Sequence, residues 1–311
     1  MKNGVEEYPS ISVIIPTLNA EKWLDSLLSM LACQTILPSE ILISDSDSTD
    51  STRRIARQYN VRVKKIPREQ FDHGGTRTMA AAMTESDIIV YMTQDAIPVN
   101  EHVLERLVNS LWNNELVAAA YGRQLASADA NFFSKYLRQV NYPESSYVRC
   151  WQDRHIFGFR TIFISNSFAA YRREVLAAHG FFAQRLLFGE DTLAVANLLE
   201  NGYCVAYVSN ACVYHSHNYS IVQDIRRYFD IGVFHSEHKD QLGRFGGPGN
   251  EGRKYVFSEL ATLMNNKRYS LIPESLLRNF GKFIAYYLGK RYRWLPRCCA
   301  RNLSMNRDWW I

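Results

Sequence analysis

The sequence predicts an α/β fold, with a mixed, mainly parallel sheet, flanking helices and a C-terminal helical extension. Short apolar, β-branched runs alternate with amphipathic helix patterns over residues 11–92, as in βαβ units. Acidic or polar residues directly follow several of these runs. The last forty residues combine one long helical pattern with a marked excess of basic residues. The chain is therefore expected to hold one α/β domain, residues 1–235, and an extension, residues 236–311.

The first expected strand, residues 11–15, is a β-branched run that ends at Pro16, which is typical of a buried parallel strand. Leucines at 24, 27, 28 and 31 share one face of a helix that ends near Gln34. Strand and helix then alternate twice more. The expected strands are 41–43, 61–66 and 88–92, and the expected helices are 48–59 and 74–83.

After about residue 115 the pattern becomes mixed. Five glycines within residues 243–252 predict a mobile loop over a site. Residues 276–288 place apolar side chains on one face of a helix. The other expected elements are strands at 162–164, 168–171 and 203–208, and a helix at 191–200.

Composition indicates an ordinary globular enzyme of 311 residues, with 47% hydrophobic and 22% charged residues. No apolar run approaches the roughly 18 to 20 residues that span a bilayer, so a cytoplasmic location is expected. The six cysteines have no CxxC or other metal-binding spacing, and free thiols are expected rather than disulfides.

Charge is unevenly distributed along the chain. From Arg278 onward eight basic residues face one acidic residue, a net +7, whereas the rest of the chain is −2. Such a local excess indicates an anionic partner, for which the inner-membrane surface is one candidate. In the other interpretation, the apolar face of residues 276–288 packs on the first domain or on a second subunit. A nucleic-acid partner is not expected, because the basic residues form a tail rather than a recognisable binding motif.

Ligands of parallel sheets bind at the carboxyl ends of the strands, which focuses attention on the polar residues there. Asp45 ends the second strand and can accept a hydrogen bond from a pyrimidine N3–H, while Thr17 and Asn19 can frame the nucleoside. The cluster around Asp45 and Asp47 also reads as an N-cap of the following helix.

Asp95 follows the most hydrophobic strand and could hold a hard cation. Mg²⁺ and Mn²⁺ prefer oxygen ligands and need only one or two protein carboxylates beside diphosphate oxygens. The alternative is a helix cap before Pro98.

The segment 71–77 combines Gly74, Gly75 and Arg77 at a helix start, where backbone amides and a guanidinium favour phosphate. It matches neither GxGxxG nor a Walker loop, so neither a dinucleotide nor ATP is implied. An ordinary glycine turn is the other interpretation.

Glu190 and Asp191 open a helix and could supply a general base, although acidic residues are also favourable there through the helix dipole. His215 and His217 lie two residues apart after a strand, hence on one face, and can complete a metal site or simply line the core or surface.

Taken in order, these motifs resemble the inverting glycosyltransferase family 2 with the GT-A fold, a Rossmann-like nucleotide-diphospho-sugar transferase fold, over residues 9–235. The matching elements are residues 12–19, Asp45 with 48–50, Asp95, 190–191 and His215. Residues 71–77, 93–96 and 215–217 resemble bacterial rhamnosyltransferases of O-antigen and other surface polysaccharides, which implies dTDP-L-rhamnose as donor.

The resemblance implies roles for single residues. Asp45 would contact the pyrimidine, Asp95 would hold Mg²⁺ or Mn²⁺ with help from His215, and Asp191 would be the catalytic base, with Glu190 beside it. Two motifs depart from the family: Asp-Asp-Gly is replaced by residues 45–47, and Asp-x-Asp is reduced to residues 93–95. The remaining expected donor contacts are Pro16, Thr17, Asn19, Asp47, His73, Gly74, Arg77 and Gln94, and the expected acceptor contacts are Asn166 and His217.

The implied reaction is one in-line displacement with inversion, from the donor to a saccharide hydroxyl, with an acceptor carried on a polyprenyl diphosphate. Three alternatives stay open: a family 2 transferase that uses a UDP- or GDP-hexose, a non-catalytic assembly subunit, and another sugar-nucleotide enzyme. For a nucleotidyltransferase the expected glycine- and lysine-rich N-terminal signature is absent.

Overall fold

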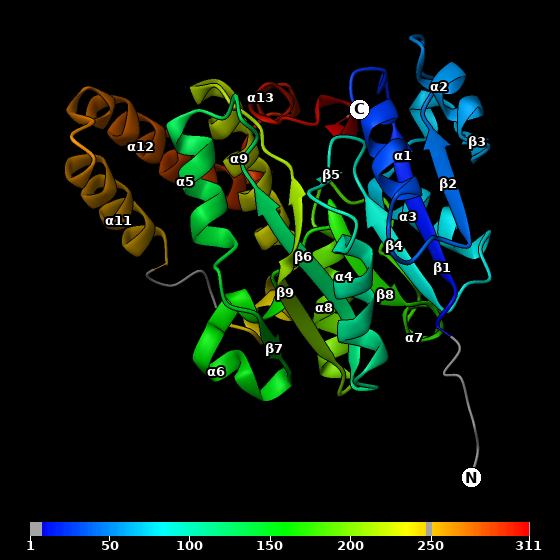
Figure 1. Ribbon diagram of the computed structural model, residues 1–311. Coiled ribbons are helices and arrows are strands. Elements are labelled where there is room, and N and C mark those ends of the chain that lie inside the picture. Colours follow the sequence, from blue (N-terminus) through cyan, green and yellow to red (C-terminus); the bar gives the residue numbers. More distant parts are fainter. Residues whose placement is uncertain (1–7, 247–250, 311) are drawn as a thin grey trace.

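A nine-stranded sheet forms the centre of the protein (Figure 1). The computed structural model describes residues 8–246 and 251–310. The strands follow the order β3-β2-β1-β4-β8-β6-β9-β5, and β7 also pairs with β9. The strands are β1 (Ile11–Thr17), β2 (Glu40–Asp45), β3 (Arg62–Lys65), β4 (Ile88–Met92), β5 (Ile97–Pro98), β6 (Val117–Leu125), β7 (Tyr147–Arg149), β8 (Phe168–Arg172) and β9 (Cys204–Tyr214).

Strand direction confirms the predicted mixed sheet. The first four strands are parallel to one another, and β6 is parallel to β9. Strand β8 runs antiparallel between β4 and β6 and joins these two parallel parts. Because β2 and β4 flank β1 on opposite sides, the loops after β1, β2 and β4 open at one edge of the sheet.

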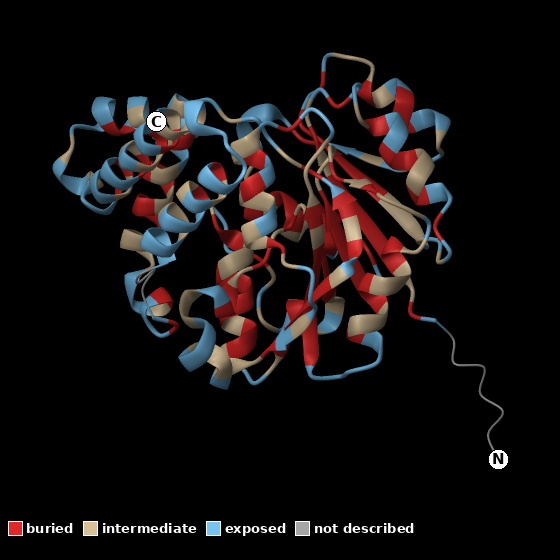
Figure 2. Ribbon diagram, turned by 60° about the vertical axis from the view of Figure 1, so that its left-hand side comes forward, coloured by how far each residue is buried: buried red, intermediate tan, exposed pale blue. Residues whose placement is uncertain are grey.

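Two apolar cores lie on the two faces of the sheet. Val13 and Ile15 of β1 face one core, which α1, α2 and α4 cover, and Ile14 faces the other, which α3 and α8 cover. Figure 2 shows the buried residues concentrated in the sheet and on the inner sides of these helices. The helices are α1 (Leu24–Ala32), α2 (Thr52–Gln58), α3 (His73–Ala82), α4 (Val103–Trp112), α5 (Phe132–Asn141), α6 (Arg154–Phe157), α7 (Arg173–Ala178), α8 (Glu190–Glu200), α9 (Ile221–Glu237), α10 (Lys239–Gly243), α11 (Glu251–Asn265), α12 (Ile272–Lys290) and α13 (Arg297–Leu303).

The predicted strand at 162–164 is wrong. Residues Gly158–Ile162 form a 3₁₀ helix, η3, and the chain continues as a loop. Ile162 and Ile164 are buried, which explains the strand-like apolar pattern. The buried guanidinium of Arg149 donates to the carbonyl oxygens of Arg160 and Phe163, so a side chain binds these carbonyls instead of a neighbouring strand.

The expectation of free thiols is wrong for two of the six cysteines. Cys150 and Cys204 form a disulfide. Antiparallel pairing of β7 with β9 sets Arg149 opposite Val205. Cys150, which directly follows β7, therefore lies beside Cys204, which directly precedes Val205. The partners are 54 residues apart in sequence, and only the strand pairing brings them together.

The C-terminal extension packs against the first domain through α9 and α12. Gly232 on α9 and Gly289 on α12 allow this close approach, because a Cβ on either would overlap backbone of the other helix. The expected boundary at residue 235 falls within the last turn of α9. Residues 247–250, the centre of the expected mobile loop, lie outside the described residues. Among the described helices, none combines the length and apolar character needed to cross a membrane.

Candidate active site

The loops after β1 and β2 form one corner of the site. Asp45 is fully buried at the end of β2 and accepts hydrogen bonds from Thr17 Oγ1 (3.2 Å) and from the Ser48 backbone N–H (3.3 Å). The Arg53 side chain lies 3.8 Å from the same carboxylate. The aspartate therefore anchors its own loop. The N-cap interpretation is wrong for Asp45 and Asp47, because α2 begins after Ser51, which makes no side-chain cap hydrogen bond.

Asn19 connects the same two loops, because its backbone N–H donates to Ser48 Oγ (2.9 Å) and its Oδ1 accepts from the Thr49 N–H (3.0 Å). Asn19 and Asp47 both have left-handed backbone conformations, with φ of 50° and 55°. Both residues are exposed. Pro16 lies within β1, opposite Ser44 of β2.

Gln94 connects this corner to the end of β4. Its Oε1 accepts from the Leu18 N–H (2.8 Å), and its Nε2 donates to the Leu18 carbonyl (3.2 Å). Both ends of the amide are thus used to fix the β1 loop. The next residue is Asp95, so the expected nucleoside and metal residues share one strand-end edge.

Asp95, His215 and His217 form a second cluster. His215 Nε2 lies 3.4 Å from Asp95 Oδ1, and His217 Nε2 lies 3.7 Å from Asp95 Oδ2. One ligand atom from each of the three side chains lies within 4.8 Å of the others. The structure therefore brings together the two predicted metal residues and adds His217, which the sequence had suggested for the acceptor.

The orientation of His215 fits a metal ligand. Its Nδ1 lies 2.9 Å from Gln124 Oε1, and Gln124 Nε2 donates to Ser165 Oγ at 3.1 Å. This assigns the hydrogen to Nδ1 and leaves the lone pair of Nε2 facing Asp95. Metal-ligating histidines are commonly oriented in this way by an acceptor that binds the other ring nitrogen. Two acceptors that face each other need a cation between them, and a carboxylate with two imidazoles suits Mn²⁺ or another divalent ion.

Burial alone raises the pKa of Asp95, but the His215 hydrogen bond and the positive charge of both histidines outweigh burial and lower that pKa to about 2. Burial and the neighbouring His215 lower the pKa of His217 to about 4. His217 is therefore neutral at physiological pH, the state that binds a metal.

Glu190 and Asp191 open α8, but their surroundings differ. Arg77 forms an ion pair with Glu190 (2.8 Å), and both side chains are buried. Asp191 is less buried, and its Oδ2 accepts from the Asn166 backbone N–H (3.2 Å). Asn166 contacts both carboxyls, since its backbone binds Asp191 and its side-chain Nδ2 donates to Glu190 (3.4 Å), while its Oδ1 accepts from Tyr171 (2.8 Å).

These surroundings separate the pKa values of the two carboxyls. Burial and the adjacent Glu190 charge raise the pKa of Asp191 to about 7. Burial also acts to raise the pKa of Glu190, but Arg77 and His73 hold it below its usual range. Asp191 has the value suited to a general base near neutral pH, and Glu190 is a fixed anion beside it.

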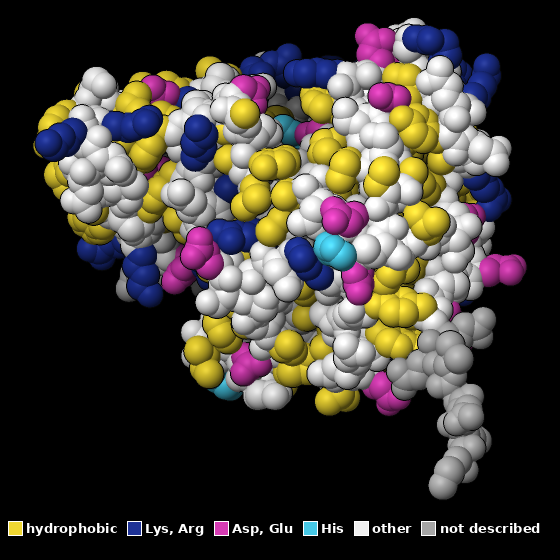
Figure 3. Space-filling view, viewed as in Figure 1, with side chains coloured by type: hydrophobic (Ala, Val, Ile, Leu, Met, Phe, Trp, Pro, Cys, Tyr) yellow, Lys and Arg dark blue, Asp and Glu magenta, His cyan; other side chains and the backbone are white. Residues whose placement is uncertain are grey.

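Residues 165 and 166 connect the two clusters. Ser165 receives the hydrogen bond from Gln124, which orients His215, and Asn166 donates its backbone N–H to Asp191. The candidate metal ligands and the candidate base are therefore positioned through two consecutive residues. Figure 3 shows a hollow near the top of the protein in which a histidine and an acidic side chain are visible, with basic side chains along its rim.

The predicted diphosphate contacts at the start of α3 have other partners. Arg77 is buried against Glu190 and the His73 carbonyl. Gly74 is also buried, and a Cβ there would overlap the Ala183 carbonyl, so this glycine serves packing between segments. Burial lowers the pKa of His73. This turn supports Glu190 from inside the protein.

Sequence reasoning missed two cations beside the metal cluster. Arg138 of α5 and Arg227 of α9 both act electrostatically on His217. Arg227 also lies over the Tyr219 ring, 5.8 Å from its centroid. The Arg138 Nε is buried with no hydrogen-bond partner among the described residues. Neither arginine belongs to a motif, so only the tertiary structure reveals them.

The family model described as Glycosyl transferase family 2 matches residues 12–180. O-antigen chain rhamnosyltransferase WbaN of Salmonella anatum is 42% identical over 305 residues, covering 97% of this chain and 96% of that protein. O-antigen chain rhamnosyltransferase RfbN of Salmonella typhimurium is 39% identical over 302 residues, covering 96% of each.

Solved structures show the same fold. S. aureus TarS 1–349 has a TM-score of 0.58 at 17% identity, covering 96% of this chain and 84% of that chain. Mannosyltransferase PcManGT from Pyrobaculum calidifontis, in complex with GDP-Man and Mn²⁺, also has a TM-score of 0.58 at 17% identity, covering 98% and 88%. These likenesses confirm the expected GT-A arrangement. The family match and the two Salmonella relatives show that this chain is a glycosyltransferase and belongs to glycosyltransferase family 2.

Proposed function

We propose that this enzyme transfers L-rhamnose from dTDP-L-rhamnose to a saccharide hydroxyl, with inversion, in O-antigen synthesis. The observation that carries the proposal is the link through residues 165 and 166, which sets a metal-binding cluster and a carboxyl with a pKa of about 7 side by side. Near-full-length identity of 42% and 39% to two proteins named O-antigen chain rhamnosyltransferases supports the sugar and the pathway.

Donor binding is assigned to the strand-end edge. Asp45 accepts from the pyrimidine, and Thr17 and Asn19 shape the nucleoside corner. Asp95, His215 and His217 would hold Mg²⁺ or Mn²⁺, which would supply positive charge to the departing diphosphate. Arg138 and Arg227 take over the cationic role that the sequence had suggested for Arg77.

Asp191 removes the proton of the acceptor hydroxyl as its oxygen bonds to the anomeric carbon. The bond from that carbon to the diphosphate breaks, and dTDP leaves with the electron pair. Attack from the face opposite the leaving group converts a β-linked donor into an α-L-rhamnoside. Glu190 keeps its negative charge through Arg77 and holds the pKa of Asp191 high.

A lipid-linked acceptor and a peripheral position on the cytoplasmic face of the inner membrane belong to the same proposal. A Campylobacter jejuni relative, 21% identical over 310 residues, is named as a GalNAc(5)-diNAcBac-PP-undecaprenol beta-1,3-glucosyltransferase. Its name specifies a polyprenyl-diphosphate-linked saccharide as acceptor, and an enzyme that uses such an acceptor would meet it at the membrane.

The decisive experiment measures nucleoside diphosphate released from dTDP-rhamnose, dTDP-glucose, UDP-glucose, UDP-galactose and GDP-mannose, with Mn²⁺, Mg²⁺ or EDTA. Metal-dependent release from dTDP-rhamnose alone is expected. Release from a UDP or GDP sugar would keep the mechanism and overturn the donor. Lack of turnover with every donor, in the presence of Salmonella lipid-linked O-antigen intermediates, would favour a non-catalytic subunit.

A further inference from the structure

Helix α12 buries its polar side and exposes its apolar side, which is the reverse of an ordinary surface helix. Its buried residues are polar or small and recur every three or four positions, so they form one face. This face packs along α9, where Gly289 meets Phe229 and Gly232. The buried residues are Ser275, Arg278, Lys282, Ala285 and Gly289.

The charged and polar side chains on the buried face of α12 all have partners. Arg278 pairs with Asp224 of α9 (2.7 Å) and with Glu274 (2.7 Å), and Lys282 lies 3.6 Å from Asp224. Ser275 donates to the buried Glu259 of α11. Because these buried charges have partners, the orientation of α12 is specified and cannot be reversed without breaking ion pairs.

The opposite side of α12 faces solvent and is apolar or aromatic from Leu276 to Leu288. Seven side chains, between 37% and 64% exposed, form a stripe along the helix, which we call the outer face of α12. It does not pack on the first domain, so a membrane surface and a second subunit are the interpretations that remain. The outer face of α12 comprises Leu276, Leu277, Phe280, Phe283, Ile284, Tyr287 and Leu288.

Large aromatic residues also lie exposed at the two ends of this helix. Tyr269 precedes α12 and is 61% exposed, and Trp294 follows it and is 82% exposed. Phe257 and Met264 of the neighbouring α11 are exposed as well. Tyrosine and tryptophan with one apolar and one polar end are typical of the boundary between lipid and water.

Basic side chains surround the outer face. Lys267 and Arg268 lie before α12, and Lys290, Arg291 and Arg293 lie at its end; all five are exposed. No carboxylate lies within ion-pair distance of any of the five in the part of the chain that the structure describes. Figure 3 shows hydrophobic and basic side chains interleaved over α11 and α12 at the left-hand edge.

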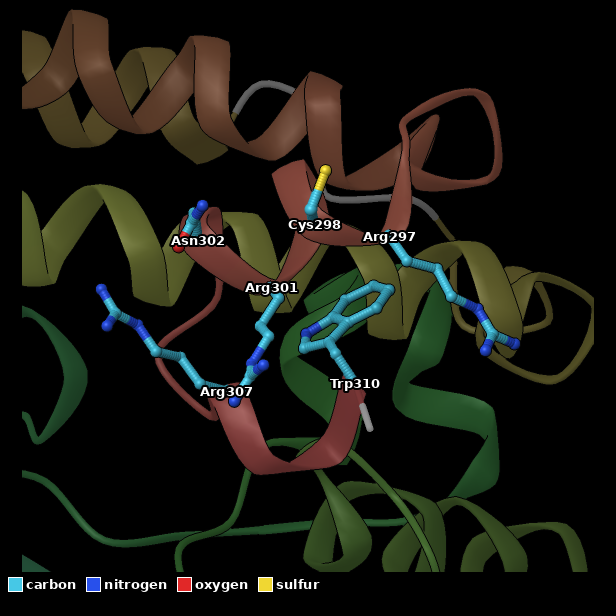
Figure 4. Close-up of a pocket in the computed structure, with 6 residues that line it drawn as sticks. All are labelled: Arg297, Cys298, Arg301, Asn302, Arg307 and Trp310. Carbon is cyan, nitrogen blue, oxygen red and sulfur yellow. The ribbon is translucent and has the colours of Figure 1, made fainter.

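Further cations lie beyond this rim, on α13 and in the 3₁₀ helix that follows it, Arg307–Trp310. Arg297, Arg301 and Arg307 line a hollow of about 400 Å³ around Trp310. In Figure 4, Arg301 and Arg307 lie on one side of Trp310 and Arg297 lies on the other, and the side chains of Arg297 and Arg307 extend outward in opposite directions. The positive surface thus continues from the end of α12 onto α13.

Charge decides which occupant fits this surface. In a symmetric dimer the same patch meets itself, so two basic rims would face each other. An anionic bilayer has the opposite charge and accepts apolar side chains between its headgroups. We propose that the outer face of α12, with its basic rim, docks this protein on an anionic phospholipid membrane.

Vesicle flotation tests this docking surface without any substrate. The full chain is mixed with vesicles of phosphatidylglycerol and phosphatidylethanolamine, or of phosphatidylcholine alone, in low and high salt. Binding to the anionic vesicles is expected, with a large loss in the zwitterionic vesicles and in high salt, because each basic side chain near an anionic surface contributes about fivefold to binding.

Two double variants separate the two contributions. Phe280→Ser with Phe283→Ser, and Arg291→Glu with Arg293→Glu, should each weaken binding about tenfold or more. Ile156→Ser, another exposed apolar residue, and Arg57→Glu, an exposed cation on α2, are the matched controls and should bind like the wild type.

Equal binding by the Phe280/Phe283 double variant, or by the Arg291/Arg293 double variant, would overturn the proposal. So would light scattering that shows a dimer which only the Phe280/Phe283 change dissociates, since the face would then belong to a second copy. Donor hydrolysis in solution should be unaltered in all variants. Loss of donor turnover in the wild type would refute the proposed reaction and leave the vesicle result intact.

Discussion

The Glu190 carboxylate should set the pH at which this enzyme becomes active. Asp191 must be deprotonated to act as a base, so the rate should rise with pH through its pKa of about 7. Replacing Glu190 by glutamine removes a negative charge beside Asp191 and leaves Arg77 unopposed. Both changes favour the ionised form of Asp191, so the acid limb of the profile moves to lower pH.

The size of the shift follows from Coulomb's law. Carboxylates of consecutive residues about 6 Å apart interact by about 3 kcal/mol at an effective dielectric constant of about 20, or about 2 pH units. Arg77 lies 2.8 Å from Glu190 and already offsets part of this repulsion. A downward shift of about 1 to 2 pH units is therefore expected for Glu190→Gln.

The assay follows dTDP release from dTDP-rhamnose against pH, with saturating metal, for the wild type and four variants. Arg77→Met should move the acid limb to higher pH, because the negative charge of Glu190 is then uncompensated. The Arg77→Met/Glu190→Gln double variant should return the acid limb toward its position in the wild type. Glu200→Gln, at the far end of the same helix, is the control and should leave the profile unchanged.

An acid limb that stays in place, or moves upward, in a folded Glu190→Gln protein would refute this reasoning. Folding is checked by thermal unfolding and by dTDP affinity, because either single variant leaves a buried charge without its partner and is expected to lose about 3 to 5 kcal/mol of stability. The double variant has no such unpaired charge and keeps the test valid if a single variant fails to fold.

Three further outcomes are expected. Asp191→Asn should abolish transfer while the donor affinity, measured by calorimetry, stays within severalfold; loss of donor binding would remove Asp191 from the role of base. His217→Ala should weaken Mn²⁺ binding in the presence of dTDP about tenfold or more by electron paramagnetic resonance, whereas His155→Ala, at an exposed histidine, should not; equal affinity in both would exclude His217 from the metal site. Gly289→Ala should lower the free energy of unfolding in urea by about 1 to 3 kcal/mol, because its Cβ would overlap the Phe229 carbonyl, whereas Gly243→Ala, with open space around it, should not; unfolding curves that coincide would refute the close helix contact.

The parallel half of the fold could be predicted from local pattern because each strand there is a short apolar run. Residues 88–92 were expected as a strand and form β4 with the same bounds. The pattern failed at 162–164, where burial without strand pairing produced the same apolar signature. Periodicity reports which residues are buried, and it does not report whether a neighbouring strand is present.

Site residues that lie at strand ends could be predicted from the sequence. Residues whose role depends on a distant side-chain partner could not. Asp95 and His215 could be named from the sequence, and the structure brings them together. Arg77 was expected at the diphosphate, yet it pairs with Glu190, 113 residues away. The pairing of Cys150 with Cys204 likewise depends on strand register, which no spacing in the sequence encodes.

The residues that hold α9 and α12 together are different residues from those that form the outer face of α12. Glycines and paired charges hold the helices together, and none of these residues lies on the outer face of α12. The outer residues can therefore be exchanged over evolutionary time without altering the catalytic domain. Related chains can inherit one catalytic core and still differ in the surfaces that they adhere to, and a protein engineer can alter that adhesion in the same way.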